Sequence, residues 1–122
     1  MILVDTSVWV DHLRRDDPKL AGLLDQGLVL THPFVIGELA LGNLAQRHAI
    51  LGDLTNLPQA KVASDDEVLR FIDRRHLYGG GIGYLDAHLL AATQLTPGAR
   101  LWTRDKRLLS AATALSLALA DP

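Results

Sequence analysis

The sequence predicts an α/β fold in which helices cover a short parallel sheet. Short apolar runs, such as residues 2–4 and 101–103, alternate with longer segments that have helical spacing. Leucine and alanine make up about a third of the 122 residues and aromatic residues only 5%, which favours an aliphatic, helix-rich core. A chain of this length can bury one core but not two, so we expect a single domain over residues 1–122.

Residues typical of helix starts divide the chain into alternating elements. We expect strands at residues 2–4, 28–31, 61–63 and 101–103, and helices that begin near residues 6, 17, 33, 46, 64, 84 and 105. Asp17 followed by Pro18 is typical of a capped helix start. Ser64 and Glu67 have the spacing of a capping box. These two starts are the best marked in the sequence.

Three other boundaries depend on weaker signals. Thr6 or Ser7 is available to cap the first helix, and the helix that starts at residue 64 is expected to end near Tyr78. The glycine-rich run at residues 79–83 is too flexible for a regular element and is expected to form a loop. Residues 115–119 fit a strand or a helix equally well.

Composition excludes several classes of protein. The sequence has no cysteine, so disulfides and thiolate metal sites are excluded, and oxygen and imidazole remain as strong metal ligands. We see no signal-peptide pattern and no apolar run of the roughly 20 residues that span a bilayer, so we expect a cytoplasmic protein without a membrane partner. The net charge of −2 argues only mildly against nucleic-acid binding, because acids gathered in a metal site would leave the remainder basic.

Four acids have positions that predict a site. Asp5 directly follows an apolar strand, and in parallel α/β folds ligands bind beyond the carboxyl ends of the strands. Asp105 lies two residues past the strand at 101–103. Glu38 lies in the helix after the second strand, and Asp86 in the first helical turn after the glycine loop. The four carboxylates can therefore converge.

Each acid taken singly also has an ordinary explanation. Asp5 could cap the following helix, and Glu38 could be an exposed helical glutamate. Asp86 could interact with the positive end of its helix dipole. Asp105 could form a surface ion pair with a basic neighbour such as Arg104.

Two known classes of protein also carry acids at strand ends, and neither matches this sequence well. A phosphatase of the haloacid dehalogenase type needs a second aspartate two residues after the first, where this chain has Ser7. A phospho-receiver domain carries its acceptor aspartate on the third strand of a longer alternation, whereas here the strand-end acids lie at opposite ends of the chain. A further alternative is a protein of the same fold that binds RNA without cutting it. The presence of all four acids argues against this alternative.

Four motifs together resemble the PIN-domain ribonucleases, and in particular the VapC-like toxins of bacterial toxin–antitoxin pairs. The motifs are DTSVW from residue 5, GEL from residue 37, GIGYLDAHLLAA from residue 81 and LWTRDKRL from residue 101. The resemblance implies a PIN-like three-layer α/β/α fold with a short central parallel sheet. It also implies an acidic site made of Asp5, Glu38, Asp86 and Asp105, with Thr6, Ser7 and Thr103 as polar support.

The implied activity is metal-dependent endoribonucleolytic hydrolysis. Cleaving an RNA phosphodiester needs a hydroxide and a counter-charge for the phosphate oxygens, and a divalent ion held by carboxylates supplies both. Mg²⁺ or Mn²⁺ is the expected ion. Arg104, together with Lys106 and Arg107, is expected to meet RNA phosphates, although solvated surface charge is an equal alternative.

The resemblance further implies a homodimer and a VapB-like antitoxin whose tail lies across the acids. The first two predicted helices carry more apolar residues than one core face needs, so we expect an antitoxin helix in a groove between them. These residues are Val8, Trp9, Leu13, Leu20, Leu23 and Leu24. Trp9 either lines this groove or belongs to the core.

Overall fold

A computed structural model describes residues 1–120 of the chain. In this part, three strands alternate with seven helices. Their bounds are β1 Ile2–Val4, α1 Thr6–Arg14, α2 Pro18–Asp25, β2 Val29–Leu30, α3 Pro33–Ala40, α4 Arg47–Asn56, α5 Asp65–Arg75, α6 Tyr84–Leu95, β3 Arg100–Trp102 and α7 Lys106–Ala114. The longest helix, α6, has 12 residues, and none of the helices in residues 1–120 combines the length and hydropathy needed to cross a membrane.

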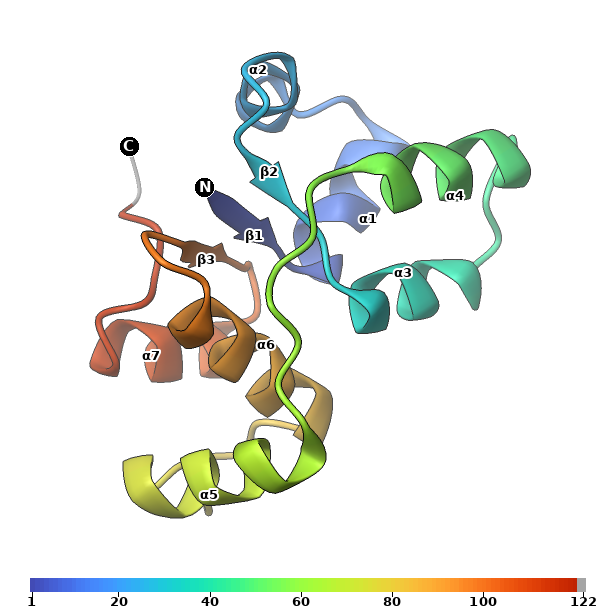
Figure 1. The fold of residues 1–122 in the computed structure, drawn as a ribbon. Coiled ribbons are helices and arrows are strands. Elements are labelled where there is room, and N and C mark those ends of the chain that lie inside the picture. The colour runs from blue at the N-terminus through green and yellow to red at the C-terminus, as the bar shows by residue number, and fades with distance from the viewer. Residues whose placement is uncertain (121–122) are drawn as a thin grey trace.

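The first strand of the chain forms the middle of a parallel sheet. The strand order is β2-β1-β3, with Ile2 opposite Val29 on one side and Leu3 opposite Leu101 on the other. Figure 1 shows this short sheet at the centre of the molecule. Because all three strands run in the same direction, their carboxyl ends lie at the same edge.

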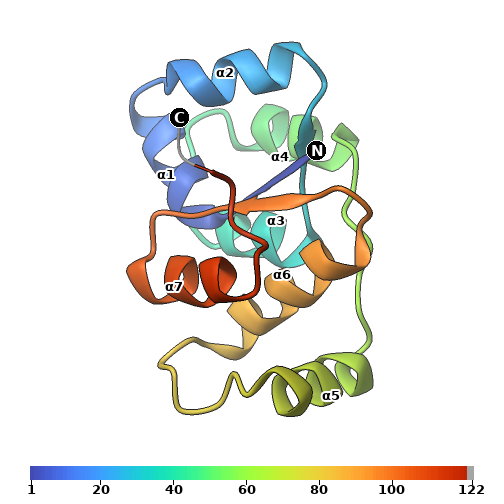
Figure 2. The same cartoon turned by 90° about the vertical axis from the view of Figure 1, so that its left-hand side faces the viewer.

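The helices form a layer on each side of the sheet. Figure 2 shows α1 and α2 on one side and α6 and α7 on the other, with α5 outside α6. The predicted three-layer α/β/α arrangement is therefore confirmed. The layers explain the apolar character of β1, because its side chains meet helices on both faces.

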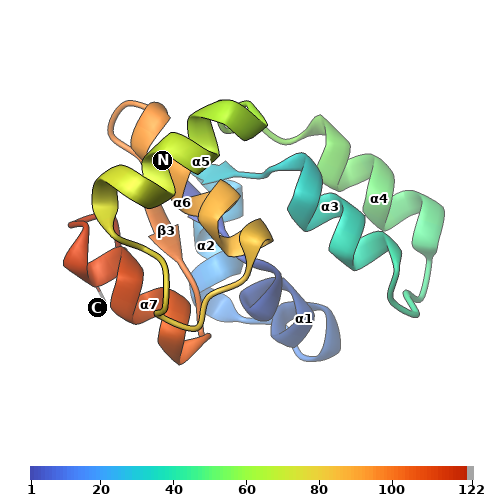
Figure 3. The ribbon, with the colours of Figure 1, turned by 90° about the horizontal axis from the view of Figure 1, so that it is seen from below.

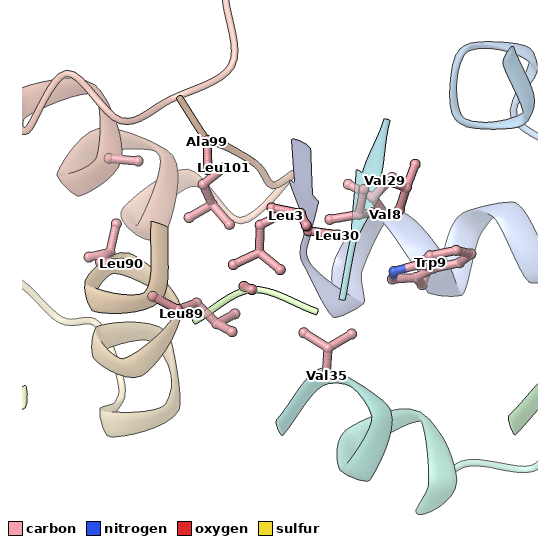
Figure 4. Packing of buried hydrophobic residues seen from close by; sticks show 14 of the residues in the cluster. Leu3, Val8, Trp9, Val29, Leu30, Val35, Leu89, Leu90, Ala99 and Leu101 are labelled. Atoms are coloured by element: carbon pink, nitrogen blue, oxygen red, sulfur yellow. The ribbon is translucent and has the colours of Figure 1, made fainter. Parts of the chain in front are cut away.

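The core is aliphatic and centres on Leu3. Figure 4 shows Leu3 surrounded by residues from β2, β3, α3 and α6, including Val35, Leu89 and Leu101. Trp9 belongs to the same cluster and is only 4% exposed. Of the two alternatives for Trp9, the core is therefore confirmed and the open groove is wrong, because its ring packs inside the molecule.

The two best-marked helix starts are confirmed. Asp17 Oδ1 accepts the backbone N–H groups of Lys19 and Leu20, and Ser64 and Glu67 form both bonds of a capping box. The start of α1 differs from the expectation. Thr6 and Ser7 are the first two residues of the helix, and the side chain of neither caps it. Their hydroxyl groups bond to acids instead.

Three segments differ from the prediction. Residues 61–63 form no strand, because the N–H of Lys61 donates to the Thr96 hydroxyl rather than to a strand. Helix α5 ends at Arg75, where the left-handed conformation of His76 breaks the helical path well before Tyr78. Residues 115–119 form neither a strand nor a helix, and only a single bridge joins this segment to β3.

Candidate active site at the carboxyl end of β1

The backbone of Asp5 is fixed between a strand and a helix. Its N–H donates to the carbonyl oxygen of Trp102 at 2.9 Å, so the pairing of β1 with β3 continues one residue past Val4. Its carbonyl oxygen accepts the N–H groups of Val8 and Trp9 at the start of α1. The side chain makes no capping bond, which excludes helix capping as the reason for this buried carboxylate.

Two hydroxyl groups hold the Asp5 carboxylate in one orientation. Ser7 Oγ donates to Asp5 Oδ2 at 2.8 Å, and Thr103 Oγ1 donates to the same oxygen at 2.7 Å. The hydroxyl oxygens in turn accept backbone N–H groups, Ser7 from Arg104 at 3.0 Å and Thr103 from Asp105 at 3.1 Å. Each hydroxyl thus uses its one hydrogen on Asp5 and ties that carboxylate to the loop after β3.

A third hydroxyl group holds Glu38. Thr6 Oγ1, in the first turn of α1, donates to Glu38 Oε1 at 3.0 Å. Glu38 is an exposed residue of α3, which packs against α1. Because Thr6 follows Asp5 directly, this bond brings Glu38 to the same end of the sheet, although no interaction within residues 1–120 joins Glu38 to another acid.

Asp86 lies on the first turn of α6, within electrostatic reach of Asp5 and Asp105. Its Oδ2 accepts the N–H of Gly83 at 3.0 Å, as an acid at the third helical position commonly does. Burial raises the pKa of Asp86, the Gly83 hydrogen bond lowers it, and the negative charges of Asp5 and Asp105 raise it further. Negative charge is therefore concentrated where these three acids approach one another.

Asp105 caps helix α7. Its Oδ1 accepts the N–H groups of Arg107 at 2.9 Å and Leu108 at 3.0 Å. In residues 1–120, no ion pair joins Asp105 to a basic side chain. The surface ion pair considered from the sequence is therefore wrong, and the carboxylate is oriented by the helix that it begins.

The four acids share one hydrogen-bonding arrangement. In each, a single carboxylate oxygen accepts all the hydrogen bonds that residues 1–120 donate, namely Oδ2 of Asp5 and Asp86, Oδ1 of Asp105 and Oε1 of Glu38. The second oxygen of each receives none from this part of the chain. Each of the four carboxylates is thus oriented through one oxygen, and its other oxygen has no hydrogen bond from residues 1–120. As they stand, no three acidic or imidazole side chains in residues 1–120 are arranged to hold a metal ion among them.

The side chain of Arg104 has a different environment from the one expected. Its Nη1 donates to Asp11 at 2.6 Å, and its Nη2 donates to Asp17. The guanidinium group also lies 5.7 Å from the centre of the Trp102 ring. Its charge is therefore paired within the protein, while its backbone N–H supports Ser7.

Known proteins identify the family. The sequence matches the PIN domain family over residues 2–114, a range that includes all four acids. This chain belongs to the PIN-domain family. The PIN domain is also similar to curated proteins named Ribonuclease VapC32 from two strains of Mycobacterium tuberculosis, CDC 1551 / Oshkosh and ATCC 25618 / H37Rv. It is 53% identical to each over 121 residues, which cover 99% of this chain and 98% of the relative.

The resemblance named Thr6, Ser7 and Thr103 as polar support, and their hydroxyl groups do donate to acids of this PIN domain, but other groups that orient the acids were missed. Three of these groups are the backbone N–H donors of Gly83, Arg104 and Asp105, which no side-chain pattern reveals. The partners of Arg104 were also missed. Asp17 was predicted only as a helix cap, although its second oxygen pairs with the guanidinium group.

Proposed function

We propose that this PIN domain is a metal-dependent endoribonuclease and the toxin of a toxin–antitoxin pair. The observation that carries the proposal is the free oxygen on each of Asp5, Glu38, Asp86 and Asp105. Carboxylates alone repel a phosphodiester, so a site of this kind needs a cation between the acids and the substrate. The similarity to proteins named Ribonuclease VapC32 supports RNA as the substrate.

The set of available donors suits Mg²⁺ or Mn²⁺. Both ions prefer carboxylate oxygens, and the sequence offers no thiolate. Mg²⁺ keeps several waters and usually takes only one or two carboxylates directly, which suits acids that form no three-ligand cage in residues 1–120. We assign the four acids to hold the ion, directly or through water. When bound, it makes water more acidic and offsets negative charge on the phosphate.

The surrounding hydroxyl groups serve to orient the acids. Ser7 and Thr103 fix the carboxylate plane of Asp5, and Thr6 fixes Glu38 in the same way. In the reaction, the oxygen of a water bonds to phosphorus and gives up a proton to solvent, the bond from phosphorus to the leaving nucleotide breaks, and the leaving oxygen takes up a proton from solvent. Preorganised acids lower the cost of assembling this arrangement around the phosphate.

The antitoxin and a second copy of the chain are the proposed protein partners. Because Trp9 is buried, we place the antitoxin helix on the hollow between α1, α3 and α4 rather than between α1 and α2. This hollow has a volume of about 370 Å³, and its lining includes Leu13, Leu39 and Glu38. An apolar helix face suits the leucines, while a basic residue beyond it suits the Glu38 carboxylate.

Cleavage of a labelled single-stranded RNA by the purified protein tests the function. We expect cutting with Mg²⁺ or Mn²⁺ and none after chelation by EDTA. Asp5→Asn and Asp86→Asn each remove a charge while nearly keeping the shape, so each should slow cleavage by roughly 100-fold, as loss of one group that stabilises transition-state charge does. Asp25→Asn is the matched control, since Asp25 is an exposed residue at the end of α2.

Two outcomes would contradict different parts of the proposal. If Asp5→Asn and Asp86→Asn cut RNA as fast as the wild type, the acids are not the site. If the wild type cuts no RNA with either ion, the enzymatic function itself is wrong. Sedimentation of the wild type alone and with its antitoxin measures the two proposed assemblies.

A further inference from the structure

A basic hollow lies beside the acids, between the end of α5, the glycine-rich loop and α7. Figure 3 shows the loop from α5 to α6 passing beside α7. The hollow has a volume of about 390 Å³ and its lining includes Arg75, His76, Lys106 and Arg107 but no carboxylate. A cavity of this size suits a small organic group, and its charge suits an anion.

The cations of the basic hollow are not neutralised by neighbouring acids. In residues 1–120, neither Lys106 nor Arg107 forms an ion pair. The Arg107 guanidinium donates a long hydrogen bond of 3.5 Å to the carbonyl oxygen of Gly81. Arg75 donates to the neutral side chain of Gln94. The positive charge at this place therefore contrasts with a chain whose net charge is −2.

The glycine-rich loop is shaped to accommodate Arg107. Gly81 has a φ of +81°, and a Cβ built on it would lie 2.9 Å from Arg107 Nη1 and 3.0 Å from Arg107 Cδ. Any other residue would strain the backbone and displace the guanidinium group. The loop thus presents Arg107 to the hollow at close range.

The basic hollow adjoins two of the four acids through the chain itself. Lys106 and Arg107 directly follow Asp105, whose Oδ1 accepts the N–H of Arg107. On the other wall, Ile82 leads into Gly83, whose N–H donates to Asp86. An RNA strand that leaves the acids in this direction must cross the hollow.

The floor of the basic hollow is apolar. Leu77 and Ile82 contribute to it from the loop side, and Ala111, Ala114 and Leu115 from α7 and the residue after it. A nucleotide combines a flat apolar face with a charged phosphate, and proteins that bind single-stranded RNA use both. An acidic peptide would match the cations but would leave the floor without a partner.

We propose that the basic hollow binds one nucleotide of the RNA, adjacent to the cleaved bond, with its phosphate at Lys106 and Arg107 and its base on the apolar floor. This inference rests on the proposed ribonuclease function and names the part of the substrate that the protein holds outside its acids. It gives the start of α7 two roles. Asp105, which caps the helix, belongs to the acidic site, and Lys106 and Arg107, which follow it, bind the phosphate.

Binding of labelled single-stranded RNA by the Asp86→Asn protein, over a range of salt concentrations, tests this inference without cleavage. In that background, the double variant Lys106→Gln/Arg107→Gln should reduce the slope of log affinity against log salt by about 1.4, since each lost phosphate contact on a single strand contributes about 0.7. Ala114→Phe, which fills the floor from an exposed position, should weaken binding roughly tenfold with the slope unchanged.

A second double variant is the matched control. Arg47→Gln/Lys61→Gln removes the same charge from exposed residues outside the hollow. It should change the slope by less than half as much as Lys106→Gln/Arg107→Gln does. Melting temperatures of all variants identify any loss of folding. The cleavage-competent wild type is assayed in parallel with the same RNA.

The outcomes separate this inference from the function on which it rests. If the wild type cuts the RNA but the Lys106→Gln/Arg107→Gln variant keeps the parental salt slope, the hollow does not bind RNA. If that variant binds RNA normally but loses affinity for a polyglutamate peptide that the parent binds, the hollow is a protein-binding site and the inference is overturned. If the wild type neither cuts nor binds RNA, the ribonuclease function fails first.

Discussion

The hydroxyl of Thr103 and the carboxylate of Asp5 are joined by a 2.7 Å hydrogen bond across 98 residues of sequence. Both residues are almost completely buried. The same hydroxyl accepts the N–H of Asp105, so one side chain connects the first and the last acid of the site. Replacing it affects both ends of this connection.

We therefore expect Thr103→Val to reduce both stability and cleavage. The change keeps the shape but leaves the Asp105 N–H without a partner and the Asp5 carboxylate with Ser7 as its one hydroxyl donor, at a cost of about 1–3 kcal/mol in the free energy of unfolding. Urea unfolding measures the stability, and cleavage assays well below the melting temperature measure activity. Thr93→Val is the control, because Thr93 is equally buried but bonds only within its own helix. Full activity in Thr103→Val would show that the orientation of Asp5 is unimportant.

Asp105→Asn should weaken the stabilisation of the fold by metal. Asparagine caps helices as well as aspartate does, so α7 should persist while one charge of the site is lost. A ligand at 100 times its Kd stabilises a protein by about 2.7 kcal/mol, and the variant should show a smaller rise in Tm on addition of Mg²⁺ or Mn²⁺. Asp17→Asn, which changes the cap of α2 in the same way, should keep the full rise. Equal rises in Asp105→Asn and the wild type would place the ion elsewhere.

Arg104→Gln should have a small effect on stability and none on RNA contacts. The variant loses partly exposed bonds to Asp11 and Asp17, and exposed ion pairs contribute about 0–1 kcal/mol each. Because the charge of Arg104 is already paired, the salt dependence of RNA binding should not change. A decrease in the salt slope by about 0.7, the value for one phosphate contact, would instead support the original expectation that Arg104 meets the RNA.

His32 should make the fold less stable in acid. Burial, and to a lesser extent the charge of His88, lowers the pKa of His32 from 6.5 to about 4. The unfolded chain then binds more protons than the folded protein between these values, so stability is complete above about pH 6.5 and falls by about 3 kcal/mol on reaching pH 4. Urea unfolding between these pH values measures the loss.

His32→Asn is the variant that tests this pH dependence. Asparagine can still accept the N–H of Phe34, as His32 Nδ1 does at 3.0 Å, but it does not titrate. The variant should be less stable at neutral pH because it is smaller, yet its loss between pH 6.5 and 4 should be smaller than that of the wild type by about 3 kcal/mol. His48→Asn, at an exposed position of α4, is the matched control for the substitution itself.

The predictions from sequence were most accurate where a local physical signal determines the structure. Asp17 and Ser64 cap helices because their side chains satisfy N–H groups only two or three residues away. Residues 61–63 were misassigned because their backbone bonds to Thr96, 35 residues further on. The end of α5 depends on His76 adopting a left-handed conformation, which is common for glycine but unusual for histidine.

The candidate site shows the same division between local and distant causes. The positions of Asp5 and Asp105 followed from strand ends, and the family resemblance connected them with Glu38 and Asp86. The distinction between a held and a free oxygen could not be predicted, because it depends on Thr103 reaching Asp5 and on backbone donors such as the Gly83 N–H. Trp9 was ambiguous for a related reason. An apolar helix face has the same sequence pattern whether the core of the domain or another protein covers it.

The central position of β1 has a consequence for the time at which the site forms during synthesis. β1 is made long before β3, and both its pairing with β3 and the bond from Thr103 to Asp5 need residues about 98 positions further along. At typical elongation rates of about 5–20 residues per second, about 5 to 20 seconds separate these two residues. A nascent chain therefore carries Asp5 without its bond to Thr103 until that residue has been made, and the ribosome that makes the chain meets no assembled acidic site before then.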